Sequence, residues 1–434
     1  MKTDRIGGVV GSTNKPVLSW CMYDWANSAF ATTIMAAVLP AYYSSVAGST
    51  LGKTTASSYW GYTNTIGMLM VALMAPILGA MADHGGTRKK YLALFTAIGT
   101  VFTGLMILVS TGEWFLASAL YILGRIGFAG GNVFYDALLP HVAEEDRIDQ
   151  VSVTGYALGY LGGGLLLMLN LAAIMRPEVF GIPNAEWASR LSFLSVGVWW
   201  ALFSIPLFKN VGEPPARQIP GESRNPIRAG FQRIRKTFRE VRRFREAFTF
   251  LVAFWLYNDG IGTIIVMAVI FGAEVNIGSS TLIGAILLVQ FIGFPFSILY
   301  GRLAKRVGAK NAILFGLVVY TGIAIGGYFL RTPLHFWILA FLVGTVQGGT
   351  QALSRSLFAT MIPRFQTAEF FGFYDVSAKF SGILGPLLFG IVGQLAGSSR
   401  LSIISLIVFF VGGGLLLTQV DHEKGMRIAR EHAR

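Results

Sequence analysis

The sequence predicts an all-α integral membrane protein with twelve transmembrane helices in two six-helix bundles and with both chain ends in the cytoplasm. Composition is the first observation: 53% of the 434 residues are hydrophobic, only 13% are charged, and the mean hydropathy is +0.59. Soluble domains carry about 25% charged residues, so this composition excludes an ordinary soluble protein. Regularly spaced apolar runs and a sequence repeat between the two halves are the other observations.

Apolar runs long enough to cross a membrane are separated by polar breaks along the whole chain. A hydrocarbon layer of about 30 Å needs about 20 helical residues. Runs of this kind lie at 19–44, 59–82, 91–110, 115–139, 151–175, 190–208, 247–272, 280–301, 311–330, 336–360, 370–396 and 401–418. The polar, Gly-rich residues before the first run do not resemble a cleavable signal peptide.

Lysines and arginines set the expected orientation, because positively charged loops stay in the cytoplasm. With both termini inside, most of the 35 basic residues fall in cytoplasmic segments. Those in the outer loops are Lys53, Arg176, Arg190, Arg331 and Arg400. The net charge of +13 therefore follows from membrane topology, and we expect no nucleic-acid partner.

A long basic connection at 209–246 divides the chain into an N-terminal bundle at 1–208 and a C-terminal bundle at 247–418, with a cytoplasmic tail at 419–434. Within the connection an apolar stripe recurs at spacings of three and four: Phe231, Ile234, Phe238, Val241 and Phe244. This stripe predicts an in-plane amphipathic helix on anionic lipid. A solvated basic linker is the alternative.

The two halves repeat each other in sequence. The stretch GAMADHGGTRK from Gly79 aligns with GRLAKRVGAKN from Gly301, which matches Gly86 with Gly308 and Arg88 with Lys310. Duplicated six-helix halves are the plan of transporters that hold a solute between two bundles and rock around it.

Charged and amide side chains concentrate on particular runs. An ionised side chain at the bilayer centre costs about 2.5 to 3.5 kcal/mol on insertion scales, so each one needs a partner, water or a task. The first, fourth, seventh and tenth runs hold Asp24, Asn27, Arg125, Asn132, Asp136, Asn258, Asp259, Gln347, Gln351 and Arg355. Every third run from the third onward holds none in its interior. This cycle predicts a cavity lined by one set of helices and supported by another.

We expect two groups of functional residues. The substrate and proton cavity is predicted to be lined by Asp24, Asn27, Arg125, Asn132, Tyr257, Asn258, Asp259, Gln347, Gln351 and Lys379. An inner gate is predicted from charges nearer the cytoplasm: Asp83, Arg88, Asp136, Arg355 and Asp375. Asp24 is expected to pair with Arg355 or Lys379 when the gate shuts. Ion pairs that simply lock helices together are the alternative.

Proton coupling, if present, must use carboxylates. The five histidines fall in loops, at helix ends or in the tail, so no imidazole lies at mid-membrane. Asp259 is the first candidate and Asp24 the second, because burial and a neighbouring cation move a carboxyl pKa in opposite directions. The single cysteine, Cys21, excludes an intrachain disulfide and a Cys-based metal cluster. We expect neither a cofactor nor a metal.

The stretch GAMADHGGTRKK resembles the loop signature between the second and third helices of the major facilitator superfamily, and maps onto it Gly79, Asp83, Gly86, Arg88 and Lys89. The resemblance implies that Asp83 caps a helix terminus in the other half and helps to hold an outward-open state. LGRIGFAGG is similar to the fourth-helix signature, which places Arg125 on the arginine often linked to proton coupling.

Five blocks in order resemble the branch that contains autophagy-related vacuolar amino-acid effluxers and bacterial permeases: YDWANSAFATTIMAAVLPAYY, VTGYALGYLGGG, YNDGIGT, VQGGTQALSRSLFATMIP and FFGFYDVSAKFSGILGPLLFG. Membership implies amino-acid efflux. The short termini and short linker favour a bacterial inner membrane over a vacuole.

The predicted function is secondary active transport of a small polar solute, an amino acid or related zwitterion, by alternating access with proton coupling. Organic anions, and then lipid-like or drug solutes, are alternative cargoes. A receptor or scaffold with a transporter fold is a remote alternative. An enzyme is not expected, because the sequence shows no nucleotide loop and no nucleophile beside a base. We expect a monomer.

Overall fold

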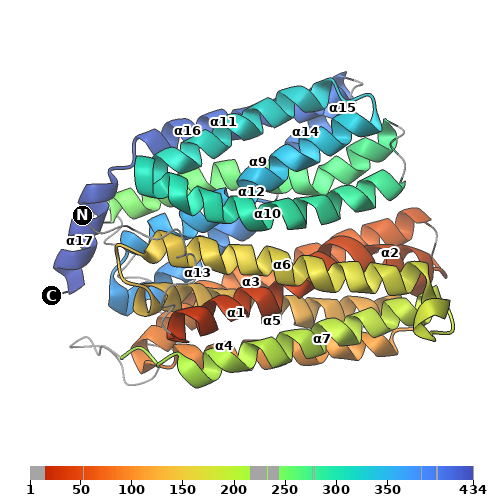
Figure 1. Cartoon of the computed structure of the whole chain (residues 1–434), viewed down its shortest axis with the longest axis horizontal. Helices are drawn as coiled ribbons and strands as arrows, with labels where there is room; N and C mark the ends of the chain where they lie inside the picture. The colour runs from red at the N-terminus through yellow and green to blue at the C-terminus, as the bar shows by residue number, and fades with distance from the viewer. Residues whose placement is uncertain are drawn as a thin grey trace, which may run out of the picture.

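The computed structural model describes residues 15–51, 53–215, 232, 244–275, 277, 279–382, 384–396 and 399–433. Within these ranges the regular structure is helical throughout. Figure 1 shows two bundles of long, roughly parallel helices lying side by side. One bundle holds α1 to α7 and the other holds α9 to α16.

The N-terminal bundle begins with one long bent segment. It consists of α1 (Lys15–Ala29), the wider π-helical η1 (Phe30–Ala37), α2 (Val38–Tyr42) and the π-helical η2 (Tyr43–Ala47). The bundle continues with α3 (Lys53–Gly85), α4 (Arg88–Leu105), η3 (Met106–Leu108), α5 (Trp114–Val142), α6 (Ile148–Met175), η4 (Pro177–Phe180) and α7 (Ala185–Asn210).

The C-terminal bundle follows the basic connection in the chain. It contains α9 (Arg245–Glu274), α10 (Ser279–Val307), α11 (Ala309–Tyr328), α12 (Pro333–Thr360), η5 (Arg364–Gln366), α13 (Thr367–Phe380), α14 (Leu384–Ala396), α15 (Ser399–Ser405) and α16 (Ile407–Thr418). A last helix, α17 (His422–Ala433), follows α16.

Ten helices of the described part are long and apolar enough to cross a membrane. Two shorter apolar helices, Leu69–Gly85 and Leu384–Gly393, overlap the expected second and eleventh spans. The chain is therefore a multi-pass helical membrane protein. The total of twelve spans and the side on which the termini lie stay predictions.

Two expected spans are interrupted. The run at 370–396 is divided into α13 and α14, and the run at 401–418 is divided into α15 and α16. The first interruption has a physical cause: Asp259 on α9 accepts hydrogen bonds from the backbone N–H groups of Leu384 and Gly385, at 3.1 and 2.9 Å. A carboxylate in this position satisfies donors that the start of a new helix leaves open.

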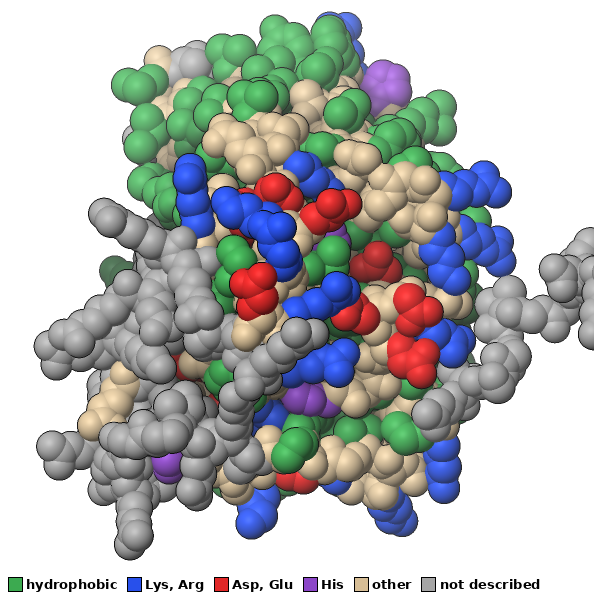
Figure 2. All heavy atoms as spheres, turned by 90° about the vertical axis from the view of Figure 1, so that its left-hand side faces the viewer, with side chains coloured by type: hydrophobic (Ala, Val, Ile, Leu, Met, Phe, Trp, Pro, Cys, Tyr) green, Lys and Arg blue, Asp and Glu red, His purple; other side chains and the backbone are tan. Residues whose placement is uncertain are grey.

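One end of the molecule gathers the start of α1, the end of α7, the start of α9 and the whole of α17 (Figure 1). We call this end the linker end, because both sides of the basic connection reach it. Figure 2 shows its face, where acidic and basic side chains are intermingled and apolar side chains lie toward the upper rim.

The repeat predicted from sequence has counterparts in the backbone. Gly86 and Gly308 occupy matching loops and both have positive φ, 57° and 83°. Residues other than glycine rarely adopt this backbone region. Each half also carries one lysine that holds the end of its last long helix. Lys89 Nζ donates to the carbonyls of Phe208, at 3.1 Å, and Val211. Lys310 Nζ donates to Thr418 and Val420, both at 2.8 Å, so its structural counterpart is Lys89 rather than the aligned Arg88.

The predicted amphipathic linker helix falls mostly outside the described residues. Phe231, Ile234, Phe238 and Val241 lie there. Phe244 is described and is buried, with its ring 5.2 Å from that of Phe370. This residue packs inside the C-terminal bundle and is not available to a lipid surface.

Candidate functional site

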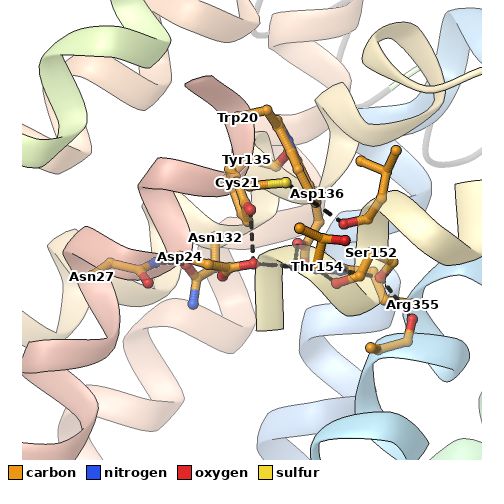
Figure 3. A network of polar contacts seen from close by, with 12 residues as sticks. Trp20, Cys21, Asp24, Asn27, Asn132, Tyr135, Asp136, Ser152, Thr154 and Arg355 are labelled. Atoms are coloured by element: carbon orange, nitrogen blue, oxygen red, sulfur yellow. Dashed lines mark hydrogen bonds and ion pairs between the residues drawn. The ribbon is translucent and has the colours of Figure 1, made fainter. Parts of the chain in front are cut away.

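Arg355 of α12 joins the two bundles. Its guanidinium lies in the N-terminal bundle, where Nη2 is 3.2 Å from Asp24 Oδ2 and Nη1 is 3.0 Å from Asp136 Oδ1. Only 2% of the Arg355 surface is exposed. The two carboxylates come from α1 and α5, and the cation comes from α12. These ion pairs therefore join the two halves of the molecule (Figure 3).

The remaining N–H groups of Arg355 are also used. Nε donates to Ser152 Oγ at 2.9 Å, Nη2 donates to the Ser152 carbonyl at 3.0 Å, and Nη1 makes a second bond to Asp24 Oδ2 at 3.3 Å. With the two ion-pair contacts, the number of bonds equals the five donors that a guanidinium carries. A buried charge is tolerated when it is paired and hydrogen-bonded in this way.

Aromatic rings enclose the same guanidinium. Its central carbon is 4.8 Å from the ring centroid of Trp20, 5.5 Å from that of Tyr135 and 4.4 Å from that of Tyr156. Tyr135 also donates from its hydroxyl to Asp24 Oδ2 at 2.8 Å. Rings at these distances attract a cation. We call the set Trp20, Asp24, Tyr135, Asp136, Ser152 and Tyr156 the Arg355 cage.

A glycine lets α6 approach the ion pair. A Cβ atom on Gly155 would lie 2.5 Å from Asp24 Oδ2 and 3.2 Å from Arg355 Nη2. One turn on, a Cβ on Gly159 would lie 2.5 Å from Ser28 Oγ. These two glycines of α6 therefore create the space in which α1 and the cage pack.

Asp83 makes a second contact between the halves. Its carboxylate pairs with Arg88 and accepts hydrogen bonds from the backbone N–H groups of Ala368, at 3.2 Å, and Glu369, at 2.9 Å. Those donors belong to the first turn of α13, so Asp83 caps a helix of the other bundle. Arg88 Nη2 also donates to the Phe365 carbonyl at 3.2 Å, across the same boundary.

Further hydrogen bonds cross between the bundles near the linker end. Ser152 Oγ donates to the Ala352 carbonyl at 2.7 Å, and Lys305 Nζ donates to Gln150 Oε1 at 2.9 Å. Close helix packing accompanies them: a Cβ on Gly79 would lie 2.1 Å from the Ala368 carbonyl oxygen, and one on Gly301 would lie 2.6 Å from Val153. The repeat-matched glycines thus serve equivalent contacts, and the linker end is closed in this structure.

Most predicted cavity residues bond within their own bundle. Asn27 Nδ2 donates to Asn132 at 2.7 Å, Arg125 Nη1 donates to the Tyr121 hydroxyl at 2.7 Å, and Asn258 Nδ2 donates to Ser381 at 2.6 Å. Tyr257 and Ser354 share a hydrogen bond of 2.6 Å. Gln347 differs, since its side chain interacts electrostatically with Tyr160 of the other bundle. Gln351 is half-buried on α12.

The predicted set also includes Asp259, Asp375 and Lys379. Asp259 was expected in the cavity, but it is 1% exposed and its carboxylate caps α14 in this structure. Asp375 is buried on α13 and interacts electrostatically with Asp136, which places it beside the Arg355 cage. The side chain of Lys379 lies outside the described residues.

Sequence reasoning did not single out the cage residues Trp20, Tyr135, Ser152 and Tyr156. Helical spacing offered a signal, because Trp20 lies four residues before Asp24 and Ser152 lies four residues before Tyr156, so each pair shares a helix face. Among the described residues, no cluster of His, Cys, Asp or Glu has the arrangement of a metal site.

Comparison with known proteins decides the family. A family model described as vacuole effluxer Atg22 like matches residues 48–430. The chain belongs to the Atg22-like family. The uncharacterized MFS-type transporter YxiO of Bacillus subtilis (strain 168) is 39% identical over 415 residues, covering 95% of this chain and 96% of that protein. Autophagy-related protein 22 of Yarrowia lipolytica (strain CLIB 122 / E 150) is 26% identical over 457 residues, covering 85% and 76%.

Solved structures of transporters share the fold of this Atg22-like chain. The human organic anion transporter MFSD10 (TETRAN) matches with a TM-score of 0.70 and 16% identity, covering 93% of this chain and 99% of that one. The proton:xylose symporter XylE matches with a TM-score of 0.69 and 15% identity, covering 97% and 98%. At such identities the likeness shows the fold alone. The family and superfamily expected from the sequence motifs are confirmed.

Proposed function

We propose that this Atg22-like protein is a secondary transporter that moves a small polar solute, an amino acid or a related zwitterion, by alternating access. The observation that carries the proposal is Arg355, which one bundle supplies and the other bundle holds with Asp24, Asp136 and Ser152. Ion pairs between two rocking halves can form in one state and break in the other.

The present conformation corresponds to one end of that cycle. Asp83 and the Arg355 cage tie the halves together at the linker end. The distribution of lysine and arginine assigns the linker end to the cytoplasm. A closed linker end is therefore an outward-facing state, and return to the inward-facing state requires both sets of contacts to break.

The proposed substrate class rests on charge. Arg125 on α5 is a buried cation that suits a carboxylate, and Lys379 on α13 is assigned to the same task. Asn27, Asn132 and Asn258 supply amides that can bond either end of a zwitterion. An organic anion is the second candidate, because two cations suit it equally well, and the structural neighbour MFSD10 is an organic anion transporter.

We assign proton coupling to Asp24 before Asp259, which reverses the order expected from sequence. The Asp259 carboxylate accepts two backbone hydrogen bonds within one bundle, which favour a permanently charged cap. Asp24 instead loses Arg355 when the halves separate, so its charge can follow the conformation.

Location and assembly complete the proposal. The bacterial relative YxiO favours a bacterial inner membrane, whereas the Atg22 relatives come from fungi. We propose a monomer with anionic lipid at the basic connection and no enzymatic activity.

Proteoliposomes containing the purified protein test this proposal. Counterflow of labelled amino acids and organic acids is measured at two pH values, with Arg355→Ala as the impaired variant. We expect saturable counterflow of at least one amino acid and a strong loss in Arg355→Ala. Counterflow by organic acids alone would replace the leading cargo with the second candidate, and the absence of counterflow for every solute would contradict transport.

A further inference from the structure

The Arg355 cage is built entirely by the N-terminal bundle. Trp20 and Asp24 lie on α1, Tyr135 and Asp136 lie on α5, and Ser152 and Tyr156 lie on α6. Only the guanidinium comes from the C-terminal bundle. When the halves separate at the linker end, the cage moves as part of one body and Arg355 leaves with the other.

Internal contacts hold the cage together without Arg355. The rings of Trp20 and Tyr135 are stacked with centroids 4.3 Å apart, and Trp20 Nε1 donates to the Tyr135 carbonyl at 3.0 Å. The Tyr135 hydroxyl fixes Asp24 through its 2.8 Å hydrogen bond. A preorganised site of this kind loses little freedom when a ligand enters.

Charge defines what the vacated cage would accept. Asp24 and Asp136 provide two carboxylates against a single guanidinium in the closed state. Removing Arg355 leaves both carboxylates in a largely buried setting, where an uncompensated charge is costly. Aromatic faces and a serine add attraction for a planar or compact cation with several N–H donors.

We propose that the Arg355 cage is a cation-binding site, which takes a guanidinium or primary ammonium group from a solute when the linker end opens. Arg355 is then a tethered competitor that fills the site when the linker end closes. This inference deepens the proposed function, since it assigns the cationic end of the cargo to Asp24 and Asp136, and it rests on the two-state motion proposed above.

A binding experiment on the purified full-length protein tests the site without any transport. The probe is methylguanidinium chloride, added at constant ionic strength, and the readout is the apparent melting temperature. We expect a saturable rise of about 2–4 °C in Arg355→Ala, because a ligand that binds only the folded state stabilises it. The wild-type protein should not respond, because its own guanidinium occupies the cage.

Matched variants separate the cage from general effects. Adding Asp136→Asn to Arg355→Ala should weaken the apparent affinity more than about tenfold, because one of two buried carboxylates is lost. Arg190→Ala is the arginine control: Arg190 lies 4.3 Å from the Trp187 ring and donates to the Ile107 carbonyl, outside the cage. This control should show no saturable response, and neutral N-methylurea should not stabilise Arg355→Ala.

If Arg355→Ala does not fold, Arg355→Gln is measured by the same titration and with the same expectation. A response that is equal in wild type, Arg190→Ala and the cage variants would overturn the inference, as would no response in both Arg355 variants. A melting-temperature rise in Arg355→Ala without measurable counterflow would support the cation site and contradict the transport proposal. Counterflow without that rise would support transport and contradict the cation site.

Discussion

Arg355 Nη1 and Asp136 Oδ1 lie 3.0 Å apart although 219 positions separate the two residues in the chain. The pair forms across the boundary between two bundles, and both partners are largely buried. Its energetic effect is therefore larger than that of an exposed ion pair, which contributes about 0–1 kcal/mol.

Arg355→Ala should open the linker end. Truncating one partner of a buried ion pair typically costs about 3–5 kcal/mol, and here the cost falls on the closed state alone. Spin labels on the exposed positions Glu144 and Arg306, one in each bundle, report the separation of the halves. We expect the inter-label distances to lengthen in Arg355→Ala and to stay unchanged in Arg190→Ala. Unchanged distances in Arg355→Ala would show that the ion pair does not control the gate.

Gly155→Ala should destabilise the protein in this conformation. The new methyl group would lie 2.5 Å from Asp24 Oδ2, and overpacking of this kind costs about 1–3 kcal/mol. Gly322→Ala is the matched control, because a Cβ there meets no atom within 4 Å. Thermal unfolding of both variants in detergent should separate them. Equal melting temperatures would show that α6 adjusts without strain.

Asp83→Ala should be more damaging than its loss of volume suggests. The change leaves the buried Arg88 without its carboxylate and removes the cap from the first turn of α13, with an expected cost of about 3–5 kcal/mol. Because the two residues act together, Asp83→Ala combined with Arg88→Gln should cost less than the sum of the single changes. Strictly additive melting-temperature losses would mean that the two side chains act independently.

Asp259→Asn should lower stability and leave proton coupling intact. The carboxylate has two accepting oxygens, whereas the asparagine amide has one. One backbone N–H donor of α14 therefore loses its partner, at a cost of about 1 kcal/mol. Substrate-driven pH change in proteoliposomes should persist in Asp259→Asn and disappear in Asp24→Asn. The opposite pattern would return the proton to Asp259, where sequence reasoning first placed it.

Much of the architecture could be predicted because apolar length and charge act locally. Each expected run contains a described helix, and the repeat matched Gly86 with Gly308, which both have positive φ in the structure. The break between α13 and α14 was not predicted, because its cause is a carboxylate 125 positions earlier in the chain. Spacing within one helix cannot show that Asp259 points at another helix.

The sequence predicted only some of the residues of the candidate site. Depth along each run predicted Asp136 and Arg355 in the inner gate and a pairing of Asp24 with Arg355 or Lys379, since depth depends only on positions within each helix. Periodicity could not show that α6 brings Ser152 and Tyr156 to the same guanidinium, because that contact requires the packing of four helices. The glycines of α6, above all Gly155, allow this packing, but the close contacts at them can be measured only in the folded structure.

A reversible crosslink tests the central claim, which is that transport requires the linker end to open. A Cβ built on Gly301 of α10 lies 3.7 Å from the Cβ of Val153 on α6, within the range of about 3.5–4.5 Å found in disulfides. The variant Val153→Cys/Gly301→Cys, in a Cys21→Ala background, should therefore form a bond between the halves.

The control bond lies within one half. Gly327→Cys/Ile403→Cys joins α11 to α15 with a corresponding separation of 3.9 Å. We predict that oxidation abolishes counterflow in the first pair, that reductant restores it, and that the second pair remains active throughout. Full counterflow through a protein whose Val153–Gly301 crosslink is complete would contradict the account.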